Sequence, residues 1–370
     1  MRILEVLNKY PAETFIQQHA LAINQHAPDI ELVWAFSQTD STGRKKSWDF
    51  SGVECYAWPN YNRFPRWKQT IFSLLYPGRK LNKLDKPQIS LIKKIRPDLI
   101  HFHFTTLAMQ YGHLCDALRI PFTFSVRGSD LQVAPLMISD FKDKLIQTVK
   151  AAKAVHCVSD SMKDELFNLT GSNDKTLVIR TTVSDEWATV ERKPERGLFI
   201  SVGRLQWLKG YPDLLLACKK LKDSNIEFHL VIIGEGPQRQ ELEFMIRDLD
   251  LNEEVKLIGQ KSHDEIREWF SRAHALVLSS IAEGFPNVIA EAMMTGVPVI
   301  TSDCGGITEL VDDKLHALVY HAGNIRELEQ KMTSFLLGSY NHDLVQNAKN
   351  MSQRTFSHSN HAQSFESLWG

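Results

Sequence analysis

Short runs of apolar residues alternate with longer amphipathic segments along this chain. In the first half the apolar runs have the length of buried strands, and the spacers between them have the length of helices. We predict strands over 3–7, 31–36, 53–58, 99–104, 122–126 and 154–158. Strands that alternate with helices in this way predict parallel βαβ units.

The alternation restarts after a polar segment, 186–197, which contains a proline. We predict strands here over 198–202, 228–233, 255–258, 275–279, 297–301 and 317–320. The spacers carry helix signals: Ser262 with Glu265 forms a capping box, and Gly296 is a typical helix end. The pattern predicts an α/β protein with two doubly wound, Rossmann-like domains that face a cleft.

The predicted division follows these patterns. We expect an N-terminal domain over 1–185, a linker over 186–197 and a second domain over 198–355. The tail, 356–370, is partly aromatic and is expected to pack back on the first domain. A chain of 370 residues with 43% hydrophobic residues has the size and composition for two packed cores.

Charge and cysteine content exclude several classes of protein. The net charge of −1 does not favour nucleic-acid binding by the whole molecule. The five cysteines include no CxxC pair, which indicates reduced thiols. The start of the chain carries charges where a signal peptide needs an apolar core, and no apolar run reaches membrane-spanning length. We expect a cytoplasmic protein, with the inner face of the membrane as an alternative location.

The segment 283–293 joins the end of a predicted strand to the start of a helix. Pro286 fits a first helical turn, and the helix that begins near Asn287 directs free N–H groups and a positive dipole end outward, which favours a phosphate. Glu283 lies before this helix and Glu291 lies inside it, so two carboxylates can accept hydrogen bonds from hydroxyl groups. Either glutamate alone also fits helix capping, but together they favour a nucleotide sugar.

A second loop offers two cations. Residues 201–210 read Ser-Val-Gly-Arg-Leu-Gln-Trp-Leu-Lys-Gly and follow another predicted strand. Arg204 supplies a planar guanidinium and Lys209 a compact ammonium, which together suit a diphosphate. The alternative interpretation is a solvated loop.

These two segments resemble the donor-site motifs of the retaining glycosyltransferase family 4, which has the GT-B fold. The Gly-Arg-Leu…Lys-Gly run and the E-x7-E spacing of Glu283 and Glu291 carry the resemblance. It covers the second half of the chain closely and the first half loosely. It is nearest to members that build bacterial exopolysaccharides, including colanic-acid-type transferases.

The resemblance implies roles for the donor residues. Glu291 would hold the ribose hydroxyls, Glu283 would hold hydroxyls of the donor sugar, and the two cations would stabilise the leaving diphosphate. A UDP-sugar is the favoured co-substrate and a GDP-sugar the alternative, with no cofactor and no metal. The implied donor-binding residues are Gly203, Arg204, Lys209, Gly234, Glu283, Gly284, Phe285, Pro286, Asn287 and Glu291.

Two loops of the first domain are expected to receive the acceptor. Residues 10–15 resemble the Pro-x-x-Glu-Thr-Phe stretch of exopolysaccharide-building members, with Glu13 and Thr14 as candidates. Residues 125–130 contribute Asp130 and Arg127. Many relatives have His-Gly-x-Asp where this chain has Arg-Gly-Ser-Asp, so Arg127 puts a permanent cation in place of a histidine. Whether Arg127 takes over that role stays open.

Two histidines fall at the end of a predicted strand. His103 is expected to reach the cleft, while His101 points to the same side but deeper, as a core histidine would. His103 and Arg127 therefore join Arg204, Lys209 and Glu283 as candidate catalytic residues.

The stretch 61–96 holds ten Lys or Arg residues and one acidic residue, interleaved with aromatic residues. It fits peripheral contact with an anionic membrane surface. It equally fits a solvated helical hairpin that packs on its own domain.

Other enzyme classes find little support. Residues 234–236 read Gly-Glu-Gly, but Arg239 occupies the third glycine position of a dinucleotide fingerprint. The one D-x-D string, 248–250, ends a helical pattern, so no metal is inferred. We predict transfer of a hexose-type sugar to a saccharide or lipid-linked acceptor, in polysaccharide or glycolipid biosynthesis. The alternatives are an epimerase or phosphorylase of the same architecture, or a degenerate binding subunit.

Overall fold

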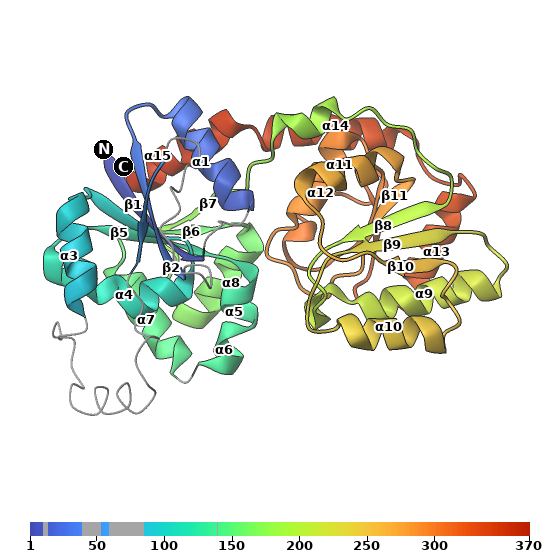
Figure 1. Ribbon diagram of the computed structural model, residues 1–370, viewed down its shortest axis with the longest axis horizontal. Helices are drawn as coiled ribbons and strands as arrows, with labels where there is room; N and C mark the ends of the chain where they lie inside the picture. Colours follow the sequence, from blue (N-terminus) through green and yellow to red (C-terminus); the bar gives the residue numbers. More distant parts are fainter. Residues whose placement is uncertain (10–13, 39–52, 59–84, 139) are drawn as a thin grey trace. The chain divides into compact units, whose positions relative to one another are not determined.

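The computed structural model describes residues 1–9, 14–38, 53–58, 85–138 and 140–370. These residues divide into two compact units (Figure 1). The first unit comprises Met1–Thr182 and His358–Gly370, and the second comprises Val183–Ser357. Each unit contains one parallel sheet with helices on both faces, as the sequence predicts.

The first unit is built on a seven-stranded sheet of order β3-β2-β1-β4-β5-β6-β7. Neighbouring strands are parallel. All six strands predicted in this half are present, and the short β7 was not predicted. The strands are β1 (Arg2–Lys9), β2 (Glu31–Gln38), β3 (Glu54–Ala57), β4 (Leu99–Phe102), β5 (Phe122–Val126), β6 (Ala154–Cys157) and β7 (Thr176–Val178).

Helices from distant parts of the sequence cover the first sheet. α1 and α15 pack against each other on one side, and α4 and α7 pack on the other (Figure 1). Phe365 and Trp369 of α15 are buried in the core with Ile3 and Leu7 of β1. The helices are α1 (Thr14–His26), α3 (Lys86–Ile95), α4 (Thr105–Leu118), α5 (Gly128–Gln132), α6 (Ala134–Met137), α7 (Phe141–Ala151), α8 (Asp160–Thr170) and α15 (His358–Trp369).

The second unit is built on a six-stranded parallel sheet of order β10-β9-β8-β11-β12-β13. All six predicted strands are present. They are β8 (Leu198–Val202), β9 (His229–Ile233), β10 (Val255–Leu257), β11 (Ala275–Leu278), β12 (Val299–Ser302) and β13 (Leu318–Tyr320).

The second sheet buries both of its faces. Leu198 and Ile200 of β8 belong to the core under α11, α12 and α14, whereas Phe199 belongs to the core under α9, α10 and α13. This alternation follows from the opposite directions of successive side chains in a strand. The helices are η3 (Asp185–Thr189), η4 (Trp207–Lys209), α9 (Tyr211–Asp223), α10 (Arg239–Asp248), α11 (His263–Arg272), α12 (Asn287–Thr295), η5 (Gly305–Ile307), α13 (Ile325–Leu336) and α14 (Asp343–Thr355).

The helix signals act as the sequence indicates. Ser262 and Glu265 form the capping box at the start of α11, with hydrogen bonds in both directions. Gly296 ends α12 with a left-handed conformation. Both features satisfy backbone groups that a helix end leaves without partners.

The division between the units differs from the predicted boundaries. The segment 186–197, expected as a linker, lies within the second unit. Trp187 is buried there and packs on Phe270 with ring centroids 5.2 Å apart, so this segment is anchored to the core. At the other end, α15 joins the first unit and residues 356 and 357 stay with the second.

For 61–96, the sequence leaves peripheral membrane contact and a solvated helical hairpin as alternatives. Residues 61–84 lie outside the described part of the chain, and 85–96 include α3. Among the described residues, we find no helix with the length and apolar character needed to span a membrane.

Candidate functional site

Most of the predicted donor residues lie on loops that follow two neighbouring strands of the second sheet, whereas Gly234 follows β9, and Asn287 and Glu291 lie in α12. β8 and β11 are adjacent, and the strand order reverses between them, with β9 beyond β8 and β12 beyond β11. Open parallel sheets bind ligands at the carboxyl ends of their strands beside such a reversal. The loops 203–210 and 279–286 both begin at this point of the sheet.

An ion pair joins the two loops. Lys209 Nζ contacts Glu283 Oε1, and the two side chains are 17% and 10% exposed. The same oxygen accepts a hydrogen bond from the Ser280 hydroxyl at 2.7 Å. The other oxygen, Glu283 Oε2, accepts no hydrogen bond from a described residue. The carboxylate therefore has one occupied oxygen and one that is available to a ligand.

Backbone contacts hold the two loops together. The Ser279 hydroxyl donates to the Lys209 carbonyl at 2.9 Å, and the Ile281 N–H donates to the Leu208 carbonyl at 2.9 Å. Gly210 has a φ of 60°, and a side chain there would collide with the Ser279 carbonyl. The close approach of the loops therefore requires glycine at this position.

A third loop supports Glu283 from behind its main chain. The Gly306 N–H donates to the Glu283 carbonyl at 3.1 Å. Gly305 has a φ of 52°, and a side chain there would strike the same carbonyl. This loop follows β12, so three consecutive strands of the sheet fix the position of Glu283.

Arg204 and two glycines complete the strand ends. Arg204 is exposed, and its guanidinium forms no ion pair or hydrogen bond with the residues that the structure describes. Gly203 donates to the Ile233 carbonyl at 3.0 Å and Gly234 donates to the Gly259 carbonyl at 2.9 Å. The two glycines thus continue the hydrogen bonding of the sheet into the loops.

The start of α12 has the form expected of an anion site. Pro286 caps the helix without a side-chain hydrogen bond, and no acidic residue lies in the first turn. Gly284 is buried, and Phe285 packs edge-on against Phe356 with centroids 5.8 Å apart. Asn287 Oδ1 is buried and makes no hydrogen bond with the described residues. The Ile289 N–H donates to the Pro286 carbonyl at 3.0 Å. The N–H groups of Asn287 and Val288 before it are therefore the ones left for an acceptor.

Glu291 lies in the second turn of α12 and is partly buried. Burial raises the pKa of its carboxyl to about 7. Its carboxylate has no hydrogen-bond partner among the described residues. A ligand hydroxyl that donates a hydrogen bond to this carboxylate would stabilise its ionised form.

In the first unit, Arg127 and Asp130 follow β5. The Asp130 carboxylate accepts hydrogen bonds from the Arg127 N–H at 3.0 Å and from the Thr105 N–H at 3.4 Å, and so joins the loops after β4 and β5. Burial raises the pKa of Asp130 to about 6. The Arg127 guanidinium lies 4.0 Å from the centre of the Phe15 ring, and its Nε donates to the His103 carbonyl at 3.3 Å.

His103 is fully buried, which differs from the expected position at an open strand end. Its Nε2 lies 3.2 Å from Glu5 Oε2, and neither ring nitrogen makes a hydrogen bond with a described residue. Burial lowers the pKa of His103. The buried Glu5 and His19 enclose it, because β1 and α1 lie next to the end of β4.

Glu5, His19 and His103 are the described residues whose side chains come together as metal ligands do, with ligand atoms within 4.8 Å of one another. Hydrogen bonds already account for Glu5: Oε1 pairs with His19 Nε2 and Oε2 accepts from Trp34 Nε1, both at 2.7 Å. Although burial alone would raise it, the two histidines hold the pKa of Glu5 well below its usual range. Hydrogen bonds within the unit therefore satisfy both carboxylate oxygens of Glu5.

Three further residues of the first unit that the sequence singles out are Thr14, Glu13 and His101. Thr14 is the first residue of α1, and Glu13 lies outside the described residues. His101 is a core histidine: Nδ1 pairs with the Thr123 hydroxyl at 2.7 Å and Nε2 with the Ser125 hydroxyl at 2.9 Å.

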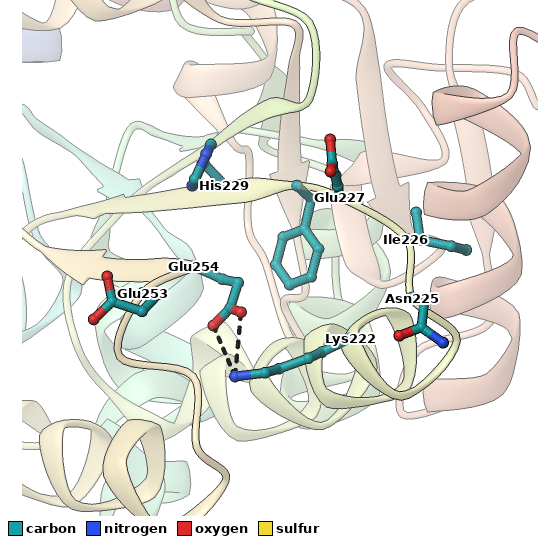
Figure 2. Close-up of a pocket in the computed structure, with 8 residues that line it drawn as sticks. Lys222, Asn225, Ile226, Glu227, His229, Glu253 and Glu254 are labelled. Atoms are coloured by element: carbon teal, nitrogen blue, oxygen red, sulfur yellow. Dashed lines mark hydrogen bonds and ion pairs between the residues drawn. The ribbon is translucent and has the colours of Figure 1, made fainter.

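A surface depression lies at the opposite edge of the second sheet. Figure 2 shows Lys222 directed toward Glu254, and the two form an ion pair of 3.2 Å. His229, which begins β9, also lines this depression. It lies at the amino ends of the strands and shares no residue with the loops that carry Lys209 and Glu283.

Two family models match the chain in tandem. The model described as glycosyltransferase family 4 matches residues 43–187, and the model described as glycosyl transferases group 1 matches residues 183–351. Residues 43–187 and 183–351 are thus similar to two kinds of glycosyltransferase domain, and we call them the family 4 domain and the group 1 domain. The group 1 domain contains Arg204, Lys209, Glu283 and Glu291, and the family 4 domain contains His103 and Arg127.

Curated relatives of these glycosyltransferase domains are named for polysaccharide synthesis. The chain is 30% identical over 242 residues to TuaC of Bacillus subtilis, named for teichuronic acid biosynthesis, and the match covers 61% of this chain and 58% of TuaC. It is 34% identical over 135 residues to the amylovoran biosynthesis glycosyltransferase AmsK of Erwinia amylovora, covering 35% of this chain and 33% of AmsK. It thus spans about three fifths of the length of TuaC.

Solved structures show the same GT-B fold. The Anabaena protein HepE, solved with UDP and glucose, has a TM-score of 0.80 at 17% identity, covering 100% of this chain and 99% of HepE. The lipopolysaccharide outer core galactosyltransferase WaaB, solved in its apo form, has a TM-score of 0.73 at 20% identity, with coverage of 100% and 99%. Both carry two Rossmann-like domains, as does this chain.

Sequence reasoning missed one contact in the group 1 domain. Ser280, which bonds to Glu283, precedes the loop motif by three residues and has no distinctive spacing. From the sequence alone, a serine after a buried strand is interpreted as a residue of the hydrophobic core, because its hydrogen-bond partner is not visible. The buried cluster around Glu5 was missed for the same reason.

Proposed function

We propose that this protein is a retaining glycosyltransferase that moves a hexose-type sugar from a nucleoside diphosphate to a saccharide or lipid-linked acceptor. One observation carries the proposal: Lys209 and Glu283 pair across two loops beside the strand-order reversal, with the exposed Arg204 on the same loop as Lys209. The names of TuaC and AmsK support a role in polysaccharide synthesis, and the UDP bound to HepE supports UDP as the nucleotide.

In this proposal, different residues contact the diphosphate, the sugar and the ribose of the nucleotide sugar. Arg204 and Lys209 contact the diphosphate, because a planar guanidinium and a lysine ammonium both suit phosphate oxygens. The N–H groups at the start of α12 add further donors. Glu283 Oε2 accepts from a hydroxyl of the sugar, and the unpartnered Glu291 carboxylate accepts from the ribose hydroxyls.

The resemblance to retaining family members supports the following chemistry for residues placed in this way. The bond between the anomeric carbon and the diphosphate oxygen breaks, and an acceptor oxygen forms its new bond to the same face of that carbon. The electron pair of the broken bond stays on the diphosphate, where the two cations stabilise it. The departing phosphate oxygen takes the proton of the acceptor hydroxyl. The configuration of the sugar is thereby retained.

The family 4 domain would receive the acceptor. Arg127 is the candidate cation there, held against Phe15 and supported through Asp130. His103 is buried, so we assign it a supporting position beneath the loop that carries Arg127. The Nε of Arg127 donates a hydrogen bond to the His103 carbonyl. Glu13 and Thr14 remain candidates for the same side.

A ligand screen followed by product analysis tests the proposal. We expect UDP or GDP, and one of their sugars, to raise the unfolding temperature of the full chain, because a ligand that binds only the folded state stabilises it. Incubation with a saccharide acceptor should then give a glycoside whose anomeric configuration, measured by NMR, matches that of the donor. Conversion of the nucleotide sugar to another product without any saccharide acceptor would instead indicate an epimerase or phosphorylase. Absence of any nucleotide effect would contradict the proposed function.

A further inference from the structure

Ser280 lies between the core of the second unit and the proposed sugar-binding carboxylate. Its side chain is completely buried, and its hydroxyl donates to Glu283 Oε1 at 2.7 Å. The hydroxyl must be the donor, because a carboxylate paired with the Lys209 ammonium only accepts. Ser280 and Lys209 therefore share one oxygen of Glu283.

Ser280 is itself held by the neighbouring strand. Its carbonyl accepts a hydrogen bond from the Ser302 hydroxyl at 2.5 Å and from the Cys304 thiol at 3.2 Å. Ser302 ends β12, and Ser280 follows β11. The donor that reaches Glu283 is thus fixed to the sheet, whereas the Lys209 ammonium sits at the end of a flexible four-carbon chain.

A bound ligand affects the two partners of Glu283, the Lys209 ammonium and the Ser280 hydroxyl, in different ways. A diphosphate that binds at Arg204 and Lys209 competes with Glu283 for the Lys209 ammonium, because both are anions. It does not compete for the Ser280 hydroxyl, which is buried behind the carboxylate. One contact of Glu283 weakens when the ligand arrives, and the other persists.

We propose that Ser280 is a positioning residue that keeps Glu283 oriented while Lys209 turns to the diphosphate. With Oε1 held by Ser280, Oε2 stays free to accept from a hydroxyl of the donor sugar. This inference rests on the proposed function. It adds that recognition of the sugar depends on a buried serine that touches no ligand.

The test compares a ligand with the sugar and one without it. UDP lacks the group that Glu283 contacts, and UDP-glucose has it. In the full-length Ser280→Ala variant, we expect calorimetry to show UDP affinity within about 3-fold of the wild type and UDP-glucose affinity reduced by about 10-fold, as for loss of a hydrogen bond to a charged group. If the wild type prefers guanine nucleotides, GDP and GDP-mannose serve as the pair.

Two variants separate positioning from folding. Ser352 is another fully buried serine of the second unit, which bonds to the Lys349 carbonyl in α14, so Ser352→Ala is the matched control. We expect it to leave both affinities unchanged. Ser280→Cys keeps a side chain of similar shape with a weaker donor, and it should show a smaller selective loss even if Ser280→Ala does not fold.

A double-mutant cycle completes the test. In a Glu283→Gln background, Ser280→Ala should reduce UDP-glucose affinity by less than about 2-fold, because the carboxylate that it positions is gone. Equal losses for UDP and UDP-glucose in the serine variants, or no loss at all, would overturn the positioning role. A wild-type protein that binds neither nucleotide pair would instead contradict the proposed function itself.

Discussion

At the scale of single residues, the site contains charged groups in two different states. Lys209 and Glu283 satisfy each other in the absence of ligand. Arg204 and the carboxylate of Glu291, by contrast, have no partners among the described residues. The paired residues set the geometry of the loops, and the exposed Arg204 can bind an anion without first breaking an ion pair.

Replacement of Lys209 by alanine tests its role toward the leaving group. We expect kcat for sugar transfer to fall by about 100-fold or more, the range seen when one donor that stabilises developing negative charge is removed. Lys222→Ala is a matched control, because Lys222 is an ion-paired lysine of the same unit at the opposite sheet edge. Near-normal turnover of Lys209→Ala would remove Lys209 from this role.

The raised pKa of Glu291 predicts how the stability of the folded protein changes with pH. Burial raises its pKa from 4.5 to about 7 in the folded protein, so the folded state binds more protons than the unfolded state between these values. Its contribution to stability is complete below pH 4.5 and is lost as the pH rises through 7. Urea unfolding between pH 5 and pH 8 should therefore show a decline in the wild type that is weaker in Glu291→Gln. Identical pH profiles would show that Glu291 is not a buried acid.

At the scale of elements, α15 is the unusual feature of the first unit. It packs along α1, although more than 300 residues separate the two in sequence. His361 anchors α15 through both ring nitrogens: Nδ1 donates to the Arg180 carbonyl at 3.0 Å, and Nε2 faces His19 Nδ1 of α1 at 2.9 Å. His361 must be neutral for its Nε2 to accept this hydrogen bond from His19.

Acid should loosen this helix. Burial and the neighbouring His19 lower the pKa of His361 well below 6.5 in the folded state, so the unfolded state binds the extra proton first. Stability from this group is complete above pH 6.5 and falls as the pH drops below that value. Hydrogen exchange, corrected for intrinsic rates, should show lower protection of 358–369 at pH 5.5 than at pH 7.5. The peptide 343–355 from α14 is the control, and equal protection at both pH values would refute the prediction.

The elements also show what could be read from the sequence. The predicted strands were all found, because buried parallel strands give continuous apolar runs. β7 was missed because three half-buried residues, Thr176–Val178, give no such run. The loops around Lys209 and Glu283 were predicted from their chemistry, and the structure joins them by an ion pair. The burial of His103 was not, because it depends on α1 and β1 packing beside it, which no local pattern encodes.

At the scale of the whole molecule, the two units carry different parts of the proposed function. The donor residues all lie in the group 1 domain, where their hydrogen bonds and ion pair are internal to that unit. The candidate acceptor residues lie in the family 4 domain. Nucleotide binding should therefore respond to changes in 183–357, while acceptor preference should respond to changes near Arg127.

The return of α15 to the first unit also orders events during synthesis. The first unit begins to emerge from the ribosome before the second, yet its core still lacks Phe365 and Trp369 when residue 357 has been added. The second unit by then has all of its residues. The domain that is made first is thus completed last, and until then the face of its sheet that α15 covers is open to chaperones or to misassembly.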